Sequence, residues 1–282
     1  MRNRVPAVAL VVVAFLAGAC GRLTKAGGGV DHPTGANDLI LRVDTGGGFV
    51  APGYSLRQIP QLSLFGDGRL ITEGPQIEIY PGPALPNVVQ QTLTEDGIQA
   101  ILDAAGQAGL MGPSAHYDFG CIADAPTTTF TLVANGERHV VSAYALGMGE
   151  GACPGADTAA RAKLAAFQTK LGDLTSWLPQ GSVGAQTSYE PAEMRVYVQP
   201  YAGSPDPGLV EPPMDWKLSQ PLSSFGQPAV GLVGMRCGVV AGQDMALLLP
   251  EARAANELTP WRSDGQTYSL LFRPLLPDEH TC

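Results

Sequence analysis

The strongest constraint on the fold is an Asn-Gly pair between two runs of residues that favour β-strands. Threonine and apolar side chains alternate within residues 127–134, and a second β-rich run follows at 137–144. A type I′ turn needs positive φ at both central residues, which Asn135 and Gly136 accept readily. We therefore predict an antiparallel hairpin with one face in the core and the other half-exposed.

Two segments have the periodicity of amphipathic helices. Thr94 precedes two acidic residues, as expected of an N-cap and first turn, and Gly109 stands at the C-terminal position of a helix over 94–108. Apolar residues recur at spacings of four and three within 157–177, and Pro179 follows. We expect both helices to pack one face against a sheet.

The remaining apolar runs predict short strands. The chain has 35 glycines and 24 prolines, so we expect many turns and few long helices. In the first part, strands are expected at 39–43, 54–65, 69–72 and 76–80. In the second part, strands are expected at 194–201, 216–218, 230–240 and 268–272, with a helix at 245–256 that Pro250 delays or kinks.

This pattern predicts an α+β fold of two units, each a mostly antiparallel sheet with one or two packed helices. A polar, glycine-containing stretch without apolar periodicity separates the units. The expected organisation is a signal peptide at 1–19, a lipidated cysteine and flexible tether at 20–37, a first domain at 38–179, a linker at 180–190 and a second domain at 191–282.

The N-terminus has the features of a signal peptide. Two arginines precede an apolar stretch of 15 residues that ends in small side chains at Ala19. That stretch is shorter than the roughly 18–20 residues that span a bilayer, so a cleaved leader is favoured over a retained transmembrane helix.

Residues 16–20, Leu-Ala-Gly-Ala-Cys, resemble the lipobox of bacterial lipoproteins. The resemblance implies a diacylglyceryl group on Cys20, which becomes the mature N-terminus and anchors the protein to the extracytoplasmic face of the cell membrane. Leu16 lies four positions before the cysteine where three is usual. Ala17-x-Ala19 is also an ordinary secretory cleavage signal, which would release a soluble protein.

The number of cysteines favours lipidation. If Cys20 carries lipid, four cysteines remain and can pair completely in an oxidising compartment. Of three connectivities, Cys121 with Cys153 and Cys237 with Cys282 is preferred because each loop then closes within one unit. A zinc site is the alternative, but no Cys-x-x-Cys or paired histidine spacing occurs, so no metal and no cofactor are expected.

The net charge of the mature chain limits the kinds of partner that it can bind. Removal of residues 1–19 takes two arginines away and leaves 15 basic against 26 acidic residues, a net charge of −11. Such a chain disfavours nucleic acid and anionic headgroups. The expected partners are the membrane, through lipid, and an unknown envelope protein or small ligand, with no nucleic acid.

A second resemblance concerns the order of elements in the first unit. A strand with a Gly-Asp-Gly turn at 64–70, a helix opened by Thr-Glu at 94–102, and an aspartate followed by Pro and threonines at 124–129 are similar to a module of uncharacterised bacterial surface proteins. The resemblance covers about residues 40–177. It implies a fold and an envelope location but no activity.

The segment 114–126 contains the candidate ligand-binding residues. His116, Tyr117, Asp118 and Asp124 lie beside a cysteine expected to form a disulfide, and the two aspartates offer oxygen ligands for a calcium ion. The alternative is a plain connection from helix to hairpin in which the aspartates make local turn hydrogen bonds.

No catalytic residue is assigned, because the sequence has neither a Gly-x-Ser-x-Gly nor a His-Glu-x-x-His motif. We therefore expect a lipid-anchored, non-catalytic binding or scaffold protein of the cell envelope. The alternatives are an envelope hydrolase with a site near 114–126 and a surface protease inhibitor with disulfide-stapled loops.

Overall fold

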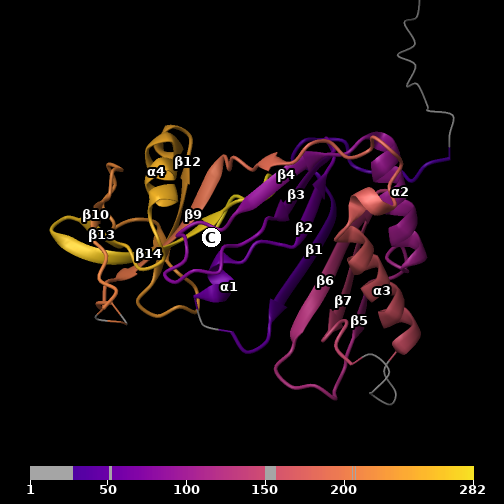
Figure 1. Cartoon of the computed structure of the whole chain (residues 1–282), viewed down its shortest axis with the longest axis horizontal. Coiled ribbons are helices and arrows are strands. Elements are labelled where there is room, and N and C mark those ends of the chain that lie inside the picture. Colours follow the sequence, from indigo (N-terminus) through magenta and orange to yellow (C-terminus); the bar gives the residue numbers. More distant parts are fainter. Residues whose placement is uncertain (1–27, 51–52, 150–156, 205, 207) are drawn as a thin grey trace, which may run out of the picture.

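The computed structural model describes residues 28–50, 53–149, 157–204, 206 and 208–282. Two sheets, of eight and six strands, follow each other along the long axis of the molecule, with four α-helices in the described part (Figure 1). The predicted α+β fold with two sheet units is confirmed. Cys20 and Cys153 lie outside the described residues.

The eight-stranded sheet has the order β5-β7-β6-β1-β2-β3-β4-β8, and its neighbours are antiparallel apart from β5 and β7, which are parallel. Its strands are β1 (Leu39–Gly47), β2 (Leu62–Phe65), β3 (Arg69–Glu73), β4 (Val88–Thr92), β5 (Ala115–Tyr117), β6 (Pro126–Ala134), β7 (Glu137–Tyr144) and β8 (Thr187–Ser188).

The predicted hairpin is confirmed as β6 and β7. Asn135 and Gly136 join the strands with φ values of 53° and 76°, the positive values that the turn requires. Phe130 and Leu132 are fully buried on the core side, as the alternation predicted.

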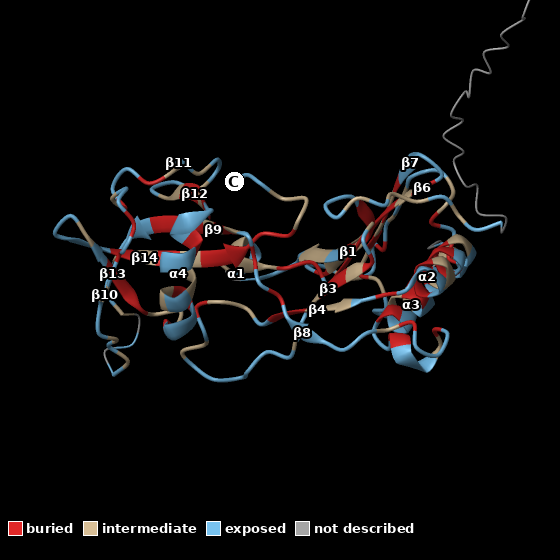
Figure 2. Cartoon of the chain, turned by 90° about the horizontal axis from the view of Figure 1, so that it is seen from above, coloured by how far each residue is buried: buried red, intermediate tan, exposed pale blue. Residues whose placement is uncertain are grey.

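Helices α2 (Glu95–Gln107) and α3 (Thr158–Leu171) cover one face of this sheet. The Thr94 hydroxyl accepts a hydrogen bond from the Gly97 amide at 3.4 Å, so the predicted N-cap is confirmed. The buried residues of both helices face the sheet (Figure 2). Helix α3 ends before the predicted boundary, and a 3₁₀ turn, η1 (Leu174–Ser176), follows it.

The strand predicted at 76–80 is wrong. Residues 74–87 form no strand of either sheet and instead make an arm that extends from β3 to the second unit and returns at β4, here called the bridging arm. Prolines 75, 81 and 83 remove backbone donors and so prevent a continuous ladder. The region 54–65 likewise begins with a short helix, α1 (Tyr54–Arg57), before β2.

The six-stranded sheet has the order β10-β13-β14-β9-β12-β11. Its strands are β9 (Glu193–Pro200), β10 (Met214–Asp215), β11 (Gln227–Pro228), β12 (Arg236–Ala241), β13 (Pro260–Ser263) and β14 (Gln266–Pro274), and helix α4 (Gln243–Ala254) packs on it with Pro250 inside the helix. Its core contains Trp216, Trp261 and Phe272, whose rings meet edge to face.

Two strand predictions in this unit need correction. The strand expected at 216–218 lies at 214–215, and of 230–240 only the end belongs to β12. Gly231 and Gly234 have positive φ in the preceding loop, where Val230 and Val233 are fully exposed. The apolar character of this stretch therefore does not reflect burial in a strand.

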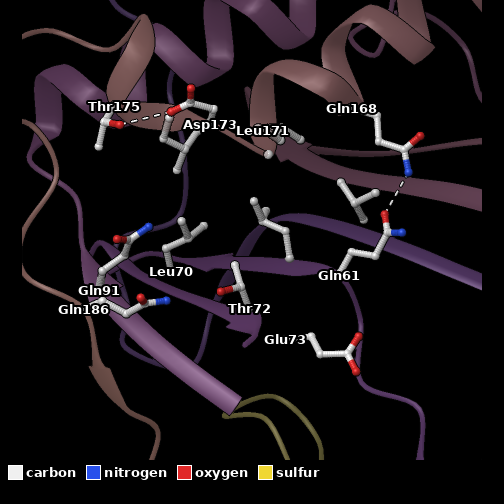
Figure 3. A pocket seen from close by; sticks show the side chains of 14 residues that line it. Gln61, Leu70, Thr72, Glu73, Gln91, Gln168, Leu171, Asp173, Thr175 and Gln186 are labelled. Atoms are coloured by element: carbon white, nitrogen blue, oxygen red, sulfur yellow. Dashed lines mark hydrogen bonds between the residues drawn. The ribbon is translucent and has the colours of Figure 1, made fainter. Parts of the chain in front are cut away.

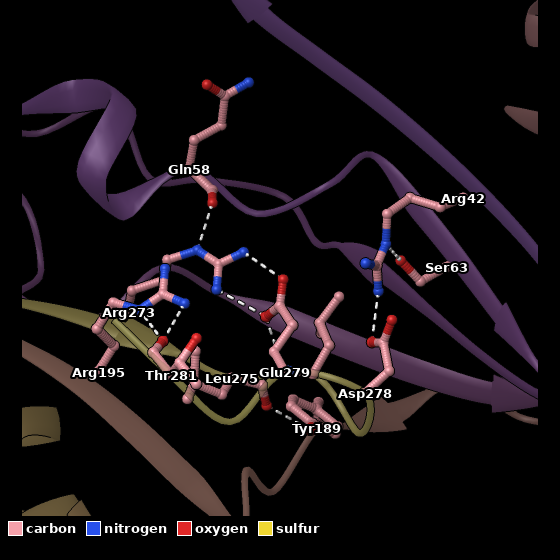
Figure 4. Close-up of polar contacts among 11 residues, drawn as sticks. Arg42, Gln58, Ser63, Tyr189, Arg195, Arg273, Leu275, Asp278, Glu279 and Thr281 are labelled. Carbon is pink, nitrogen blue, oxygen red and sulfur yellow. Dashed lines mark hydrogen bonds and ion pairs between the residues drawn. The ribbon is translucent and has the colours of Figure 1, made fainter. Parts of the chain in front are cut away.

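The second unit contacts the first through residues 275–282, here called the C-terminal tail. Leu276 is buried in an apolar cluster on the sheet face opposite the helices, with Phe65 and Ile71. Around it, the Arg273 guanidinium donates to both carboxylate oxygens of Glu279 at 2.7 and 2.9 Å (Figure 4). The predicted disulfide between Cys237 and Cys282 is confirmed and ties the end of the tail to β12.

The bridging arm and the predicted linker are two further connections between the two sheet units. Ala84 N–H donates to Ala255 O at 3.0 Å and Glu257 N–H to Gly82 O at 2.9 Å, which joins the arm to the second unit. Residues 180–190 follow the edge of the first sheet, where β8 pairs with β4. Backbone hydrogen bonds therefore hold both the bridging arm and residues 180–190 in place.

Candidate functional site

The structure brings two of the predicted site residues together with a serine. The parallel pairing of β5 with β7 places His116 directly opposite Ser142. His116 Nδ1 lies 2.8 Å from Ser142 Oγ, and its Nε2 lies 3.0 Å from Asp118 Oδ1. The result is a hydrogen-bonded serine–histidine–aspartate line on the sheet face opposite the helices.

This line is open to solvent. The side chains of His116 and Asp118 are 55% and 88% exposed. Charged groups at such a surface interact weakly and are screened by salt, whereas catalytic groups gain strength from exclusion of water. Strand register brings His116 next to Ser142, and a spacing of two residues brings Asp118 next to His116. The same hydrogen bonds could therefore serve only to hold β5 and β7 together.

The other two predicted residues point elsewhere. Tyr117 lies on the helix side of β5 and packs against the core. Asp124 has a φ of 56° in the loop before β6, and its carbonyl accepts a hydrogen bond from Phe49 N–H at 3.2 Å. No group of three or more His, Cys, Asp or Glu side chains within the described ranges is placed to hold a metal ion.

Arg161 of α3 supports the end of β7 and also contacts the loop between β5 and β6. Its guanidinium is fully buried, donates to Tyr144 O at 2.9 Å and Ala145 O at 3.0 Å, and lies 4.5 Å from the centre of the Phe119 ring. These contacts compensate the cost of burying a charge. The loop therefore packs on α3 through Phe119, and the alternative in which Asp118 and Asp124 make local turn hydrogen bonds stays a prediction.

A larger site lies on the helix side of the first sheet, where sequence reasoning placed nothing. A cleft of about 550 Å³ opens between the middle strands β1 to β4 and the end of α3 (Figure 3). Helix α3 ends at Leu171, and the chain continues along the side of the cleft through η1, so no α-helix covers this part of the sheet. The volume of the cleft is within the usual range of small-molecule sites.

The cleft has an apolar floor and a polar rim. Val43, Leu62, Leu70, Leu171 and Leu174 form the floor, and the first three come from neighbouring strands of the sheet. The rim carries amide, hydroxyl and carboxylate side chains: Gln61, Gln91, Gln168, Gln186, Thr175 and Asp173.

Within the rim, two hydrogen bonds fix the side chains. Gln168 Nε2 donates to Gln61 Oε1 at 2.8 Å and links α3 to the start of β2. The Thr175 hydroxyl donates to Asp173 Oδ1 at 3.0 Å. Figure 3 shows Gln91 and Gln186 on the other side of the cleft, without a hydrogen bond to the other residues drawn.

The electrostatic character of the cleft is neutral to acidic. Its charged lining residues are Glu73 and Asp173, and no Lys, Arg or His of the described chain lines it. Partial burial raises the pKa of Glu73, since the charged form loses hydration there. The cleft is therefore unsuited to anionic ligands.

The glutamines of the rim are separated by up to 125 positions in the sequence, from Gln61 to Gln186, and belong to no motif. Only the pairing of β2, β3 and β4 and the early end of α3 bring them together. The sequence could therefore have indicated this site only if the order of the strands in the sheet had been known.

A second, smaller cleft of about 260 Å³ lies beneath the bridging arm, between the two units. It is lined by Pro75, Pro86, Tyr189 and Pro274, with Leu249 and Arg253 of α4. The prolines leave few backbone donors here, so the cleft offers less to a polar ligand than the first one.

Comparison with known proteins found no match among family models, curated proteins or solved structures. Among the described residues, no helix is both long and apolar enough to cross a membrane.

Proposed function

We propose that this chain is a lipid-anchored, extracytoplasmic binding protein of the cell envelope, without catalytic activity, which holds a small polar ligand in the cleft beside α3. The observation that carries the proposal is the cleft itself, a part of the sheet with an apolar floor and a rim of polar side chains. Ligand sites commonly combine an apolar lining with a few convergent polar groups.

The location in this proposal is supported by the sequence. The charged start, the short apolar stretch and Cys20 within a lipobox-like segment favour export and acylation. The Cys237–Cys282 disulfide fits an oxidising compartment. The intact mass of the protein extracted from membranes tests this part: we expect loss of residues 1–19 and gain of an acylated glyceryl group, and a mass that retains the leader would contradict it.

The binding part is tested by a screen of small polar compounds against the mature chain, with side-chain amide NMR signals of glutamine as the readout. We expect compounds that bind to shift the Gln91 and Gln186 signals. Thr72→Trp, which fills the middle of the cleft, is expected to abolish those shifts. Thr175→Trp at the exposed rim serves as a second variant if the first unfolds. A screen without any cleft ligand would reject the proposal.

The second candidate is a hydrolase, favoured by the Ser142–His116–Asp118 line. In that function Ser142 Oγ would attack an ester carbonyl while His116 accepts its proton. The ester C–O bond would then break, the alcohol would leave with the proton from His116, and water would hydrolyse the acyl-serine to release the acid. Hydrolysis of p-nitrophenyl acetate and labelling with a fluorophosphonate test it. Activity that Ser142→Ala and His116→Ala abolish would support a hydrolase.

The matched control is His280→Ala, which removes another exposed histidine paired with a carboxylate, Glu193, at 3.3 Å. Equal loss of activity in this control would assign any hydrolysis to surface histidines in general.

A further inference from the structure

We propose that the ligand of the cleft is a neutral saccharide of two or three rings, a class defined by many hydroxyl groups around a ring with apolar faces. This inference rests on the proposed binding function and specifies the chemistry that the cleft recognises. Its support comes from the floor, the rim and the charge of the cleft.

The floor suits the apolar face of a sugar ring. The base of the cleft is a small apolar surface, because its lining residues from the strands (Val43, Leu62 and Leu70) and from the helix side (Leu171 and Leu174) are each at most 8% exposed. A pyranose presents axial C–H groups on its faces, which lose unfavourable contact with water when they cover such a surface. A fully apolar ligand would leave the polar rim without partners.

The rim suits hydroxyl groups. A primary amide carries two donors and an acceptor, so it can donate to one hydroxyl and accept from its neighbour. Because Gln168 donates to Gln61 Oε1, the Gln61 amide keeps both of its N–H donors, and the Gln168 carbonyl keeps its acceptor positions. Gln91 and Gln186 add a second pair of amides across the floor (Figure 3).

The charge of the cleft restricts the saccharide to one without acidic groups. Glu73 and Asp173 can each accept hydrogen bonds from hydroxyls, but they would repel a phosphate or uronate. No described lining residue is a cation that could neutralise such a group. The volume, about 550 Å³, leaves room for more than one ring.

Isothermal titration of the mature protein with three β-linked disaccharides tests the inference. Cellobiose and N,N′-diacetylchitobiose are neutral, and cellobiouronic acid has the same skeleton with a carboxylate. We expect saturable binding of at least one neutral disaccharide and at least about tenfold weaker binding of the acid, because its carboxylate meets Glu73 or Asp173. Equal or stronger binding of the acid would overturn the inference.

Adjacent glutamines of β4 provide matched variants. Gln91 lines the cleft, whereas Gln90 lies on the opposite face of the strand. We expect Gln91→Leu to weaken disaccharide binding about tenfold through loss of its hydrogen bonds, and Gln90→Leu to leave it unchanged. Gln186→Leu, at an exposed position, repeats the test where folding is not at risk. Equal affinities in all three variants would overturn the inference.

The two proposals fail in different ways. If none of the neutral disaccharides binds but other compounds in the screen shift the Gln91 signal, the cleft is a binding site for another class and only the saccharide inference is wrong. If no compound of any class shifts the signal, the binding function itself is wrong.

Discussion

The two faces of the eight-stranded sheet are closed in different ways. Between the sheet and helices α2 and α3 the contact is an apolar core. Residues such as Ile101 and Phe130 are fully buried there, and the Phe130 and Phe167 rings lie 6.1 Å apart. On the opposite face, the C-terminal tail covers a smaller apolar cluster, surrounded by charged pairs such as Arg273 with Glu279.

This difference separates two sources of stability. Burial of apolar area is roughly independent of pH and salt near neutrality, whereas charge-assisted hydrogen bonds depend on protonation. The helix-covered face should therefore set the stability of the first unit, and the tail-covered face should set how firmly the second unit is held to it. Each prediction below changes one of these faces and leaves the other intact.

The largest effect is expected on the helix-covered face. Phe130→Ala removes a fully buried ring and should lower the free energy of unfolding by about 3–5 kcal/mol. Urea unfolding followed by circular dichroism measures the loss. Phe49→Ala, at a side chain that is 93% exposed, is the control and should change stability by less than about 0.5 kcal/mol. A loss below about 1 kcal/mol for Phe130→Ala would contradict the assigned core.

The next effect concerns the covalent tie of the tail. The paired change Cys237→Ser and Cys282→Ser opens a loop with a sequence separation of 45 residues and should cost about 2–4 kcal/mol. Hydrogen exchange should report the loss first at Leu276 N–H, which donates to Glu279 Oε2 at 3.0 Å, and last in α2. Uniform loss of protection over both faces would contradict this separation.

Tyr189 gives an optical readout for the same variant. Its hydroxyl donates to Leu275 O at 2.8 Å, and burial raises its pKa to about 12. When the tail detaches, the Tyr189 phenol meets water and its pKa should fall toward the ordinary tyrosine value, so phenolate absorbance should appear at lower pH in the variant.

A smaller, pH-dependent effect is expected at Glu279. Burial alone would raise the pKa of Glu279, but the hydrogen bonds and charge of Arg273, the Leu276 N–H and the charge of Arg42 together lower it. A lowered carboxyl pKa stabilises the fold above the ordinary carboxyl range, and this contribution is lost as the pH falls through the lowered pKa.

Glu279→Gln should therefore cost about 1.5–3 kcal/mol at pH 7 and progressively less as the pH falls through the lowered pKa of the native carboxyl group. Urea unfolding over a series of pH values from 7 into the acid range measures this change in cost. Glu137→Gln changes a carboxylate that is 77% exposed at the hairpin and should show no such difference. A cost for Glu279→Gln that stays constant with pH would show that shape, not charge, holds the tail.

The smallest effect belongs to the helix side again. Thr94→Ala removes the oxygen that accepts from Gly97 N–H and should cost about 1 kcal/mol, independent of pH. Thr94→Ser keeps the acceptor and should recover most of the loss in thermal unfolding. Equal losses in both variants would mean that the threonine methyl group, not the cap, matters here.

The elements that could be predicted are those whose sequence signals are local, each contained within a few neighbouring residues. Asn135-Gly136 defined the hairpin, and Thr94 with its acidic followers defined the start of α2. A strand was wrongly predicted at 76–80 because polar and apolar residues alternate in Gln-Ile-Glu-Ile-Tyr, as they do in a half-buried strand. In the structure, this segment pairs with no strand of either sheet.

The site depended on information that a single sequence does not contain. His116 and Asp118 could be named as candidates, but Ser142 joins them only through the parallel pairing of β5 with β7. The cleft requires residues of four strands and of α3, placed by the sheet order. Burial of Arg161 was equally hidden, because a lysine or arginine in a helical pattern usually indicates the exposed face.

The bridging arm has a consequence for how the chain is completed during synthesis. Its Gly82 N–H donates to the Glu257 carboxylate, a group 175 residues further along the chain. The ribosome therefore releases the arm well before Glu257 is made, so the contact between the arm and the second unit can form only late in synthesis.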